Sequence, residues 1–303
     1  MFSHSFVKSS LKVLLGLVFI VSAVLKVVDM DKFEIYIYSY HFFSLNFSFI
    51  VARLAIILEL VLGFGLISHT LHKLYWWGSM AMLVGYSLLL WYALHMGRTD
   101  SCHCFGDYLQ LDPKQSLIKN GLLMLLLLSI YKMESWKTPF RWLLLCLALM
   151  ASAIGVFVAS PPDNLANFDP EHNLQVELFD EMLGDAPLEG LHLDEGKQIV
   201  CFFSTGCEYC QMAARKLSLM QQFHGFPGDR ITCLFMGDEE DVSMFYELSE
   251  SQRYRDVLYP DSRMLKAVNG NLPTIVFMED GKIVHEYGFR NMDEEEIRAF
   301  MAS

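Results

Sequence analysis

The strongest constraint on the fold is that long apolar segments gather in the first half of the chain. Five stretches there are long and apolar enough to cross a bilayer, which needs roughly 17–25 residues each. They lie near residues 11–28, 47–67, 74–95, 116–130 and 140–160. Nearly all of the apolar excess of this 303-residue chain is therefore N-terminal. The sequence predicts a membrane-embedded bundle of about five helices, followed by a soluble half.

Charged residues are divided just as unevenly. Residues 1–160 carry 12 Lys and Arg against 8 Asp and Glu, whereas residues 161–303 carry 11 against 27. Nucleic-acid binding needs basic patches that neutralise phosphates, so an acidic soluble half argues against a nucleic-acid partner. Membrane lipid is the partner that this composition predicts.

The segment after the last apolar stretch predicts the orientation in the membrane. No Lys or Arg occurs from residue 142 to residue 196, while ten acidic residues lie between 163 and 195. Cytoplasmic flanks of membrane helices are enriched in Lys and Arg, so this flank is expected outside. Five crossings with the N-terminus inside would place the soluble half and the loop 97–115 on the same outer face.

The soluble half has the pattern of an α/β domain. Pro161-Pro162 and the polar run to Asn173 predict a linker, 161–173, between a membrane domain over 1–160 and a domain over 174–303. Predicted strands and helices then alternate, and Asp280-Gly281 is typical of a hairpin turn. The expected strands are 197–203, 230–236, 274–278 and 282–287, and the expected helices are 207–222, 239–251, 261–268 and 293–301. This order indicates an α/β sheet.

A pair of cysteines, Cys207 and Cys210, lies where a buried strand is expected to pass into a helix. At a helix N-terminus, free N–H groups and the positive end of the dipole stabilise a thiolate, so Cys207 is the predicted nucleophile. Cys210, one turn further and less exposed, would resolve a mixed disulfide. The alternative is a zinc half-site, which needs a second ligand pair at zinc spacing that the sequence of this domain does not offer.

The residues around this motif, FFSTGCEYCQMAARKL and LPTIVFMEDGKIVHEYG, resemble the thioredoxin-like, redoxin or TlpA-type domains of bacterial cell envelopes. The resemblance covers about residues 174–303. It implies that the peptide bond before Pro273 is cis and that Pro273 faces the active disulfide. Where thioredoxins bury an acid, six residues before the first cysteine, this chain has Cys201. Cys201 and Cys233 are expected to be inert core thiols.

A second cysteine pair, Cys102 and Cys104, lies in the loop 97–115 within the motif CHCFG. Three polar residues of the apolar half complete the pattern: Lys26, Glu59 and Asn120. Together these residues resemble the DoxX/MauE-like membrane proteins, small helical bundles linked to envelope thiol redox chemistry, over about residues 8–135. A Cys-x-Cys disulfide closes a small, strained ring that is easily reduced, which suits a carrier of electrons. The alternative is a copper or zinc ligand set that includes His103.

Polar groups inside the apolar half have two interpretations. Glu59 is expected to pair with Lys26 or Arg53 and so to hold the bundle together. A second set of polar residues flanks the cysteine loop or lies just beyond it: His95, Arg98 and Asn120. These three could hydrogen-bond a quinone carbonyl, or they could be satisfied interfacial residues. Cys146, in the last apolar stretch, is expected to fill the core.

These features predict a thiol–disulfide oxidoreductase of the bacterial inner membrane, with the C-terminal domain in the extracytoplasmic space and envelope protein thiols as partners. Only Cys146 lies towards the predicted inner side, so a thiol relay from the cytoplasm is disfavoured. The favoured route passes electrons from the C-terminal domain to Cys102 and Cys104, and then to a membrane quinone. The alternative is a copper-handling or metalloprotein-maturation factor that uses Cys102, His103 and Cys104.

Overall fold

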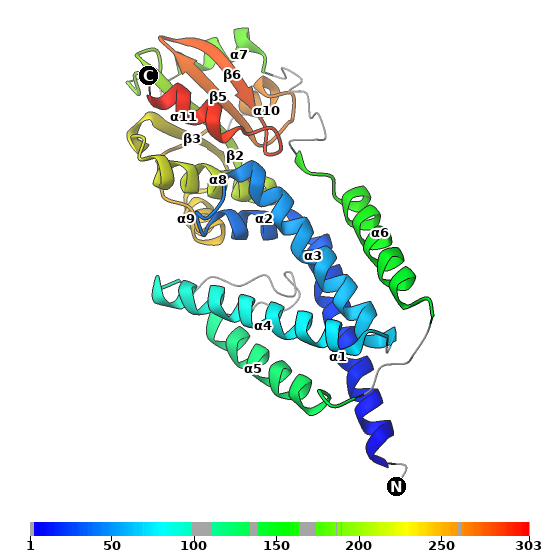
Figure 1. Cartoon of the computed structure of the whole chain (residues 1–303). Coiled ribbons are helices and arrows are strands. Elements are labelled where there is room, and N and C mark those ends of the chain that lie inside the picture. Colours follow the sequence, from blue (N-terminus) through cyan, green and yellow to red (C-terminus); the bar gives the residue numbers. More distant parts are fainter. Residues whose placement is uncertain are drawn as a thin grey trace. The chain divides into compact units, whose positions relative to one another are not determined.

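The computed structural model describes residues 3–68, 70–98, 111–133, 139–163, 174–185, 187–188, 190–259 and 262–302 (Figure 1). The chain divides into two compact units. Unit 1 contains Met1–Tyr40 and Phe47–Pro162, and unit 2 contains His41–Asn46 and Asp163–Ser303. Most of the predicted linker, residues 164–173, lies outside the described residues.

Unit 1 consists of helices. They are α1 (Ser3–Val28), α2 (Met30–Tyr38), α3 (Leu45–Ser68), α4 (His72–His95), α5 (Pro113–Ser129) and α6 (Arg141–Ala159). Within the described residues, α1, α3, α4 and α6 are long and apolar enough to cross a membrane. These four helices match four of the five predicted spans, whereas α2 was not expected.

Helix α5 forms where the remaining span was predicted, but it is only 17 residues long. It begins early because Pro113 occupies its first turn and Asp112 caps it: the Asp112 side chain accepts a hydrogen bond from the Gln115 N–H at 2.7 Å. At 1.5 Å per residue, α5 is about 25 Å long, near the lower limit for crossing a bilayer. The count of crossings, and with it the side on which unit 2 lies, therefore stays a prediction.

Helices α1 and α3 approach each other closely at two glycines. A Cβ atom on Gly16 would lie 2.7 Å from the Gly63 carbonyl oxygen, and one on Gly63 would lie 2.8 Å from the Gly16 oxygen. Small residues of this kind allow close backbone approach between membrane helices. Along the same pair of helices, Lys26 of α1 reaches Glu59 of α3.

The outward faces of these helices are apolar, as a lipid environment requires. Helix α6 has few buried side chains, and its exposed residues include Leu143, Leu147, Met150, Ile154 and Val158. Cys146 belongs to this exposed face, so the expectation that it fills the core is wrong. In a membrane helix a thiol can face lipid at little cost, because lipid tails are as apolar as a protein core.

Unit 2 is built on a five-stranded mixed sheet with the order β4-β3-β2-β5-β6. The strands are β2 (Lys197–Ser204), β3 (Ile231–Met236), β4 (Arg255–Leu258), β5 (Thr274–Glu279) and β6 (Lys282–Tyr287). Strand β2 pairs in parallel with β3 and antiparallel with β5. The predicted hairpin is confirmed: Asp280 and Gly281 both have positive φ angles, 49° and 75°, between β5 and β6.

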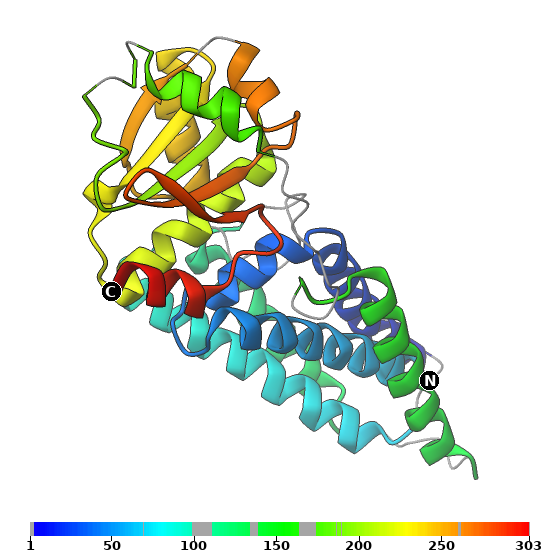
Figure 2. The ribbon, with the colours of Figure 1, turned by 90° about the horizontal axis from the view of Figure 1, so that it is seen from above.

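Helices cover both faces of this sheet (Figure 2). They are α7 (Val176–Leu183), α8 (Glu208–His224), α9 (Glu239–Ser249), α10 (Ser262–Ala267) and α11 (Glu294–Ala302), with a short 3₁₀ turn, η2, at Gly228–Arg230. Val200 and Phe202 of β2 join the core shared with α7 and α10, while Phe203 meets Phe245 of α9 on the opposite face. Successive side chains of β2 point to opposite faces of the sheet, and helices cover both faces. The sequence of β2 is therefore a continuous apolar run. The α/β prediction is confirmed, but β4 and α7 were missed.

Candidate active site

Cys207 lies at the junction of β2 and α8. It is the N-cap residue of α8, with extended backbone angles (φ −89°, ψ 113°). The backbone N–H of Cys210 donates a hydrogen bond to Cys207 Sγ at 3.2 Å. The buried residues of β2 fix the backbone before Cys207, and the first turn of α8 fixes the backbone after it. The Cys207 sulfur is therefore placed at the positive end of the helix dipole.

The two cysteines of this motif form a disulfide bond and differ in exposure. Their Cα atoms are 5.2 Å apart. Cys207 is half-buried, whereas Cys210 is fully buried beneath the first turn of α8. An attacking thiolate can therefore reach Cys207 and not Cys210, which is the difference in access that the sequence predicted.

The loop before β5 closes one side of the site. The Leu272–Pro273 peptide bond is cis, as the thioredoxin-like resemblance implied. The Leu272 carbonyl oxygen lies 4.0 Å from Cys207 Sγ, and Thr274, the residue after Pro273, pairs with Phe202 of β2. Pairing between β5 and β2 thus brings the Pro273 loop against the disulfide.

A group of aromatic and charged residues that the sequence analysis missed adjoins the active helix. Tyr209, between the two cysteines, is 47% exposed and packs its ring 5.4 Å from that of Phe289. The Arg290 guanidinium lies 5.9 Å from the Tyr209 ring and donates to Asp163 at 2.8 Å. Lys216 of α8 is fully buried, donates to the Phe289 carbonyl at 3.1 Å and lies 3.7 Å from Asp163.

Signals for this group were present in the sequence. Lys216 is the one cation in an apolar stripe of α8 with Ala213, Leu217 and Met220, so it needs a buried partner. Its partner, Asp163, falls in the segment that was interpreted as a linker, and no sequence pattern joins the two.

Cys201, at the position where thioredoxins bury an acid, lies beside Cys233, and both are free thiols. The two residues are direct neighbours in the register of β2 and β3, and both are fully buried. Burial and the adjacent Cys233 thiol raise the pKa of Cys201 well above its usual value. The thiol is therefore neutral at physiological pH and cannot replace a carboxylate as a proton acceptor for Cys210.

The second cysteine pair and His103 lie outside the described residues, which stop at residue 98 and resume at 111. The predicted disulfide, and the metal site as its alternative, therefore stay predictions. Within the described parts of the chain, no cluster of three or more His, Cys, Asp or Glu residues could hold a metal ion.

The three residues expected to contact a quinone have separate surroundings in unit 1. The Arg98 guanidinium lies over the Tyr36 and Tyr40 rings, at 5.4 and 4.9 Å. The His95 ring stacks on Trp91. Asn120 is buried and donates to Ser87 Oγ at 3.3 Å.

Four of the buried charged residues of unit 1 form two pairs. Lys26 Nζ donates to both carboxylate oxygens of Glu59, at 2.7 and 2.9 Å, and to Ser22 Oγ at 2.7 Å. This confirms the expected Lys26–Glu59 pair. Arg53 instead pairs with Glu34 of α2, the helix that the sequence analysis did not foresee.

Comparison with known proteins supports the prediction that a membrane domain precedes a second domain in this chain. Residues 5–133 match the family model described as methylamine utilisation protein MauE. Protein TlpB from Flavobacterium psychrophilum is 24% identical, with 78% of this chain and 78% of TlpB covered. The MauE part of the predicted resemblance is thereby confirmed, whereas the DoxX part stays a prediction.

Solved structures similar to part of this chain include a thiol:disulfide interchange protein from Bacteroides sp., with 19% identity and a TM-score of 0.30 over 37% of this chain and 78% of that one. StoA from Bacillus subtilis has 18% identity and a TM-score of 0.29 over 35% and 83% of the two chains. The chain is thus similar to MauE over its membrane-embedded part and to TlpB over most of its length.

Proposed function

We propose that this chain is a membrane-anchored thiol–disulfide oxidoreductase of the bacterial cell envelope. One observation carries the proposal: a half-exposed Cys207 caps α8 and is bonded to a fully buried Cys210, against the Pro273 loop. Such a dithiol at a helix N-terminus exchanges electrons with other thiols. The similarity to TlpB and to MauE is consistent with this activity in a membrane protein.

The first exchange oxidises a client protein. A client thiolate attacks Cys207 Sγ, the Cys207–Cys210 bond breaks, and Cys210 leaves as a thiolate. A second client thiolate then attacks the client sulfur of the mixed disulfide. The client gains a disulfide, and Cys207 and Cys210 take up its two electrons.

The second exchange regenerates the site. The Cys207 thiolate attacks the Cys102–Cys104 disulfide, and Cys210 resolves the mixed disulfide by attacking Cys207. The loop pair is then reduced and the Cys207–Cys210 bond is restored. Oxidation of the loop pair by a membrane quinone, with transfer of two electrons and two protons, would give a quinol and complete the cycle.

The positions of the cysteines favour this direction over reduction of clients by a thiol relay from the cytoplasm. Such a relay needs cysteines that can be reached from the inner side, and in the sequence only Cys146 lies towards the predicted inner side, without a partner. We therefore propose net oxidation, in the extracytoplasmic space that the basic-residue pattern predicts, where disulfides persist.

Trapping of clients tests the proposed roles. In a Cys210→Ser variant, the resolving thiol is absent, so Cys207 should accumulate reducible covalent adducts with envelope proteins. The matched Cys207→Ser variant should form none through this site, because Cys210 is fully buried. Equal trapping by the two variants would show that the roles are wrongly assigned.

A further inference from the structure

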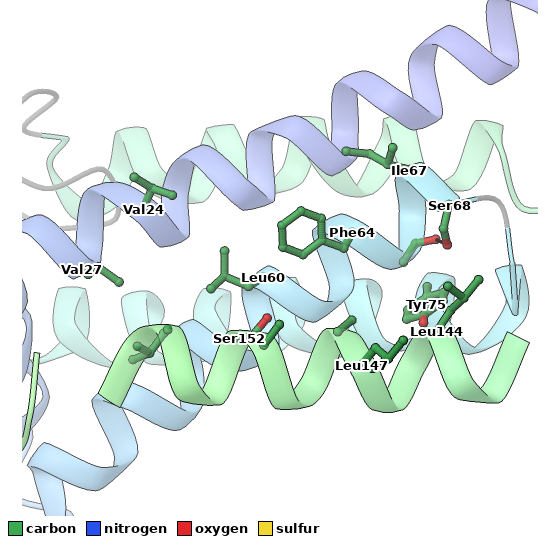
Figure 3. Close-up of a pocket in the computed structure, with 15 residues that line it drawn as sticks. Val24, Val27, Leu60, Phe64, Ile67, Ser68, Tyr75, Leu144, Leu147 and Ser152 are labelled. Atoms are coloured by element: carbon green, nitrogen blue, oxygen red, sulfur yellow. Dashed lines mark hydrogen bonds between the residues drawn. The ribbon is translucent and has the colours of Figure 1, made fainter. Parts of the chain in front are cut away.

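A large apolar cavity lies among four helices of unit 1 (Figure 3). Its volume is about 780 Å³, and its lining comes from α1, α3, α4 and α6. Within the described part of the chain, these are the helices long and apolar enough to span a membrane, so we expect a ligand to enter the cavity from the lipid phase. Cavities of about 300–1,000 Å³ are the usual size for small-molecule sites.

Hydroxyl groups are the polar side-chain groups in this lining: Ser68, Tyr75 and Ser152. Ser68 Oγ is already satisfied, because it donates to the Gly65 carbonyl at 3.0 Å. Ser152 of α6 differs. It is 5% exposed, and its Oγ has no hydrogen-bond partner among the described residues. Figure 3 shows its oxygen directed from α6 into the space beside Leu60 of α3.

An unpaired hydroxyl in an apolar wall is unfavourable, and serines in membrane helices usually bond to a carbonyl of the preceding turn. A ligand that offers a hydrogen-bond acceptor at this depth would satisfy Ser152. Lipid acyl chains carry no polar atom there, and a charged head group would find no counter-charge in this lining. A fitting occupant would therefore be neutral and largely apolar, with a hydrogen-bond acceptor near Ser152.

We propose that this cavity binds an isoprenoid quinone, with a ring carbonyl accepting a hydrogen bond from Ser152 Oγ and the tail lying along Leu60 and Phe64. The choice of a quinone over another neutral carbonyl compound rests on the proposed function, which needs a two-electron acceptor that dissolves in the membrane. The site differs from the one predicted at His95, Arg98 and Asn120, which do not line the cavity.

A larger side chain in place of Gly155 would fill the cavity without disturbing the packing of the helices. Gly155 lines the cavity one turn from Ser152, and a Cβ atom added to it would meet no atom within 4 Å. A leucine at this position would therefore extend into the ligand space. Gly85 of α4 is a matched control, because it also has open space around it and does not line the cavity.

The test measures binding of decylubiquinone to the full-length protein in lipid nanodiscs, by quenching of tryptophan fluorescence above that in empty nanodiscs. The native chain should show saturable binding. Gly155→Leu should weaken it by more than about tenfold, and Ser152→Ala, which removes one hydrogen bond, by about fivefold. Gly85→Leu should bind as the native chain does.

Two results would overturn the proposal: an unchanged affinity in Gly155→Leu, or displacement of decylubiquinone by decylbenzene at equal concentration. The second result would mean that the cavity recognises an apolar chain alone. Because no thiol reacts in this assay, absence of saturable binding would refute the quinone site and leave the thiol exchange of the proposed function standing. Failure of client trapping would, in turn, leave the binding result standing.

Discussion

Removing one partner of the Lys26–Glu59 pair should destabilise unit 1 far more than removing both. Both side chains are about 2% exposed, and three hydrogen bonds of 2.7–2.9 Å hold the Lys26 ammonium. Glu59→Leu would leave this cation with a hydrogen bond to Ser22 Oγ and the faces of two aromatic rings, but with no carboxylate on Glu59's side. Stranding a buried charge costs about 3–5 kcal/mol. In the double variant Lys26→Met/Glu59→Leu no charge is stranded, and such replacements are close to neutral.

A third charge makes the two single variants unequal. Lys119 of α5 lines a small cavity together with Lys26 and Glu59, and it interacts electrostatically with both. Glu59→Leu therefore removes the carboxylate that two cations share, whereas Lys26→Met leaves Glu59 with Lys119. We expect Glu59→Leu to be the more damaging of the two.

Thermal unfolding of the purified full-length protein in detergent measures this effect. A loss of 3–5 kcal/mol corresponds to a fall in Tm of roughly 10 °C for a unit of this size, and the double variant should recover most of that loss. A double variant less stable than either single one would refute the structural role of the pair. Loss of client trapping in a stable double variant would instead assign the pair a part in the redox cycle.

Two further predictions concern topology and thiol reactivity. A reporter that is active only in the cytoplasm, fused after Ser303, should be silent, because the Lys- and Arg-free flank after α6 favours the outside; activity there would reverse the orientation. In reduced native protein at pH 8, iodoacetamide should modify Cys207 and leave Cys201 and Cys233 untouched, because both core thiols are buried and burial keeps the pKa of Cys201 high. Mass mapping that finds label on Cys201 without denaturant would show that the core of the sheet opens.

Local patterns made the redox site predictable from sequence. The position of Cys207 follows from a buried strand that passes directly into a helix, and the hairpin follows from Asp280-Gly281 between two β-like runs. In each case the residues that decide the structure are neighbours in the chain. The cis bond at Pro273 came from the family resemblance and not from any local rule.

Features that depend on contacts distant in sequence were missed. Strand β4 is four residues long and half-exposed at an edge of the sheet, so Arg255–Leu258 lacks both an apolar run and clean alternation. The partner of Lys216 lies 53 positions away, at Asp163, in a segment with the composition of a linker. Ser152 looked like any serine in an apolar helix, because the cavity around it exists only after four helices have packed.

The central claim, that Cys207 exchanges electrons directly with the loop pair, is tested most directly by trapping the disulfide between them. Two double variants, Cys210→Ser with Cys102→Ser and Cys210→Ser with Cys104→Ser, each leave Cys207 and one loop cysteine. Each variant in its native membrane is treated with a mild thiol oxidant, which accepts the two electrons released when two lone thiols form a disulfide. Peptide mapping should then find a Cys207–Cys104 bond in the first variant, a Cys207–Cys102 bond in the second, or both. If neither bond forms while Cys207 still reacts with small disulfides, the two pairs do not exchange electrons directly, and the proposed cycle is wrong.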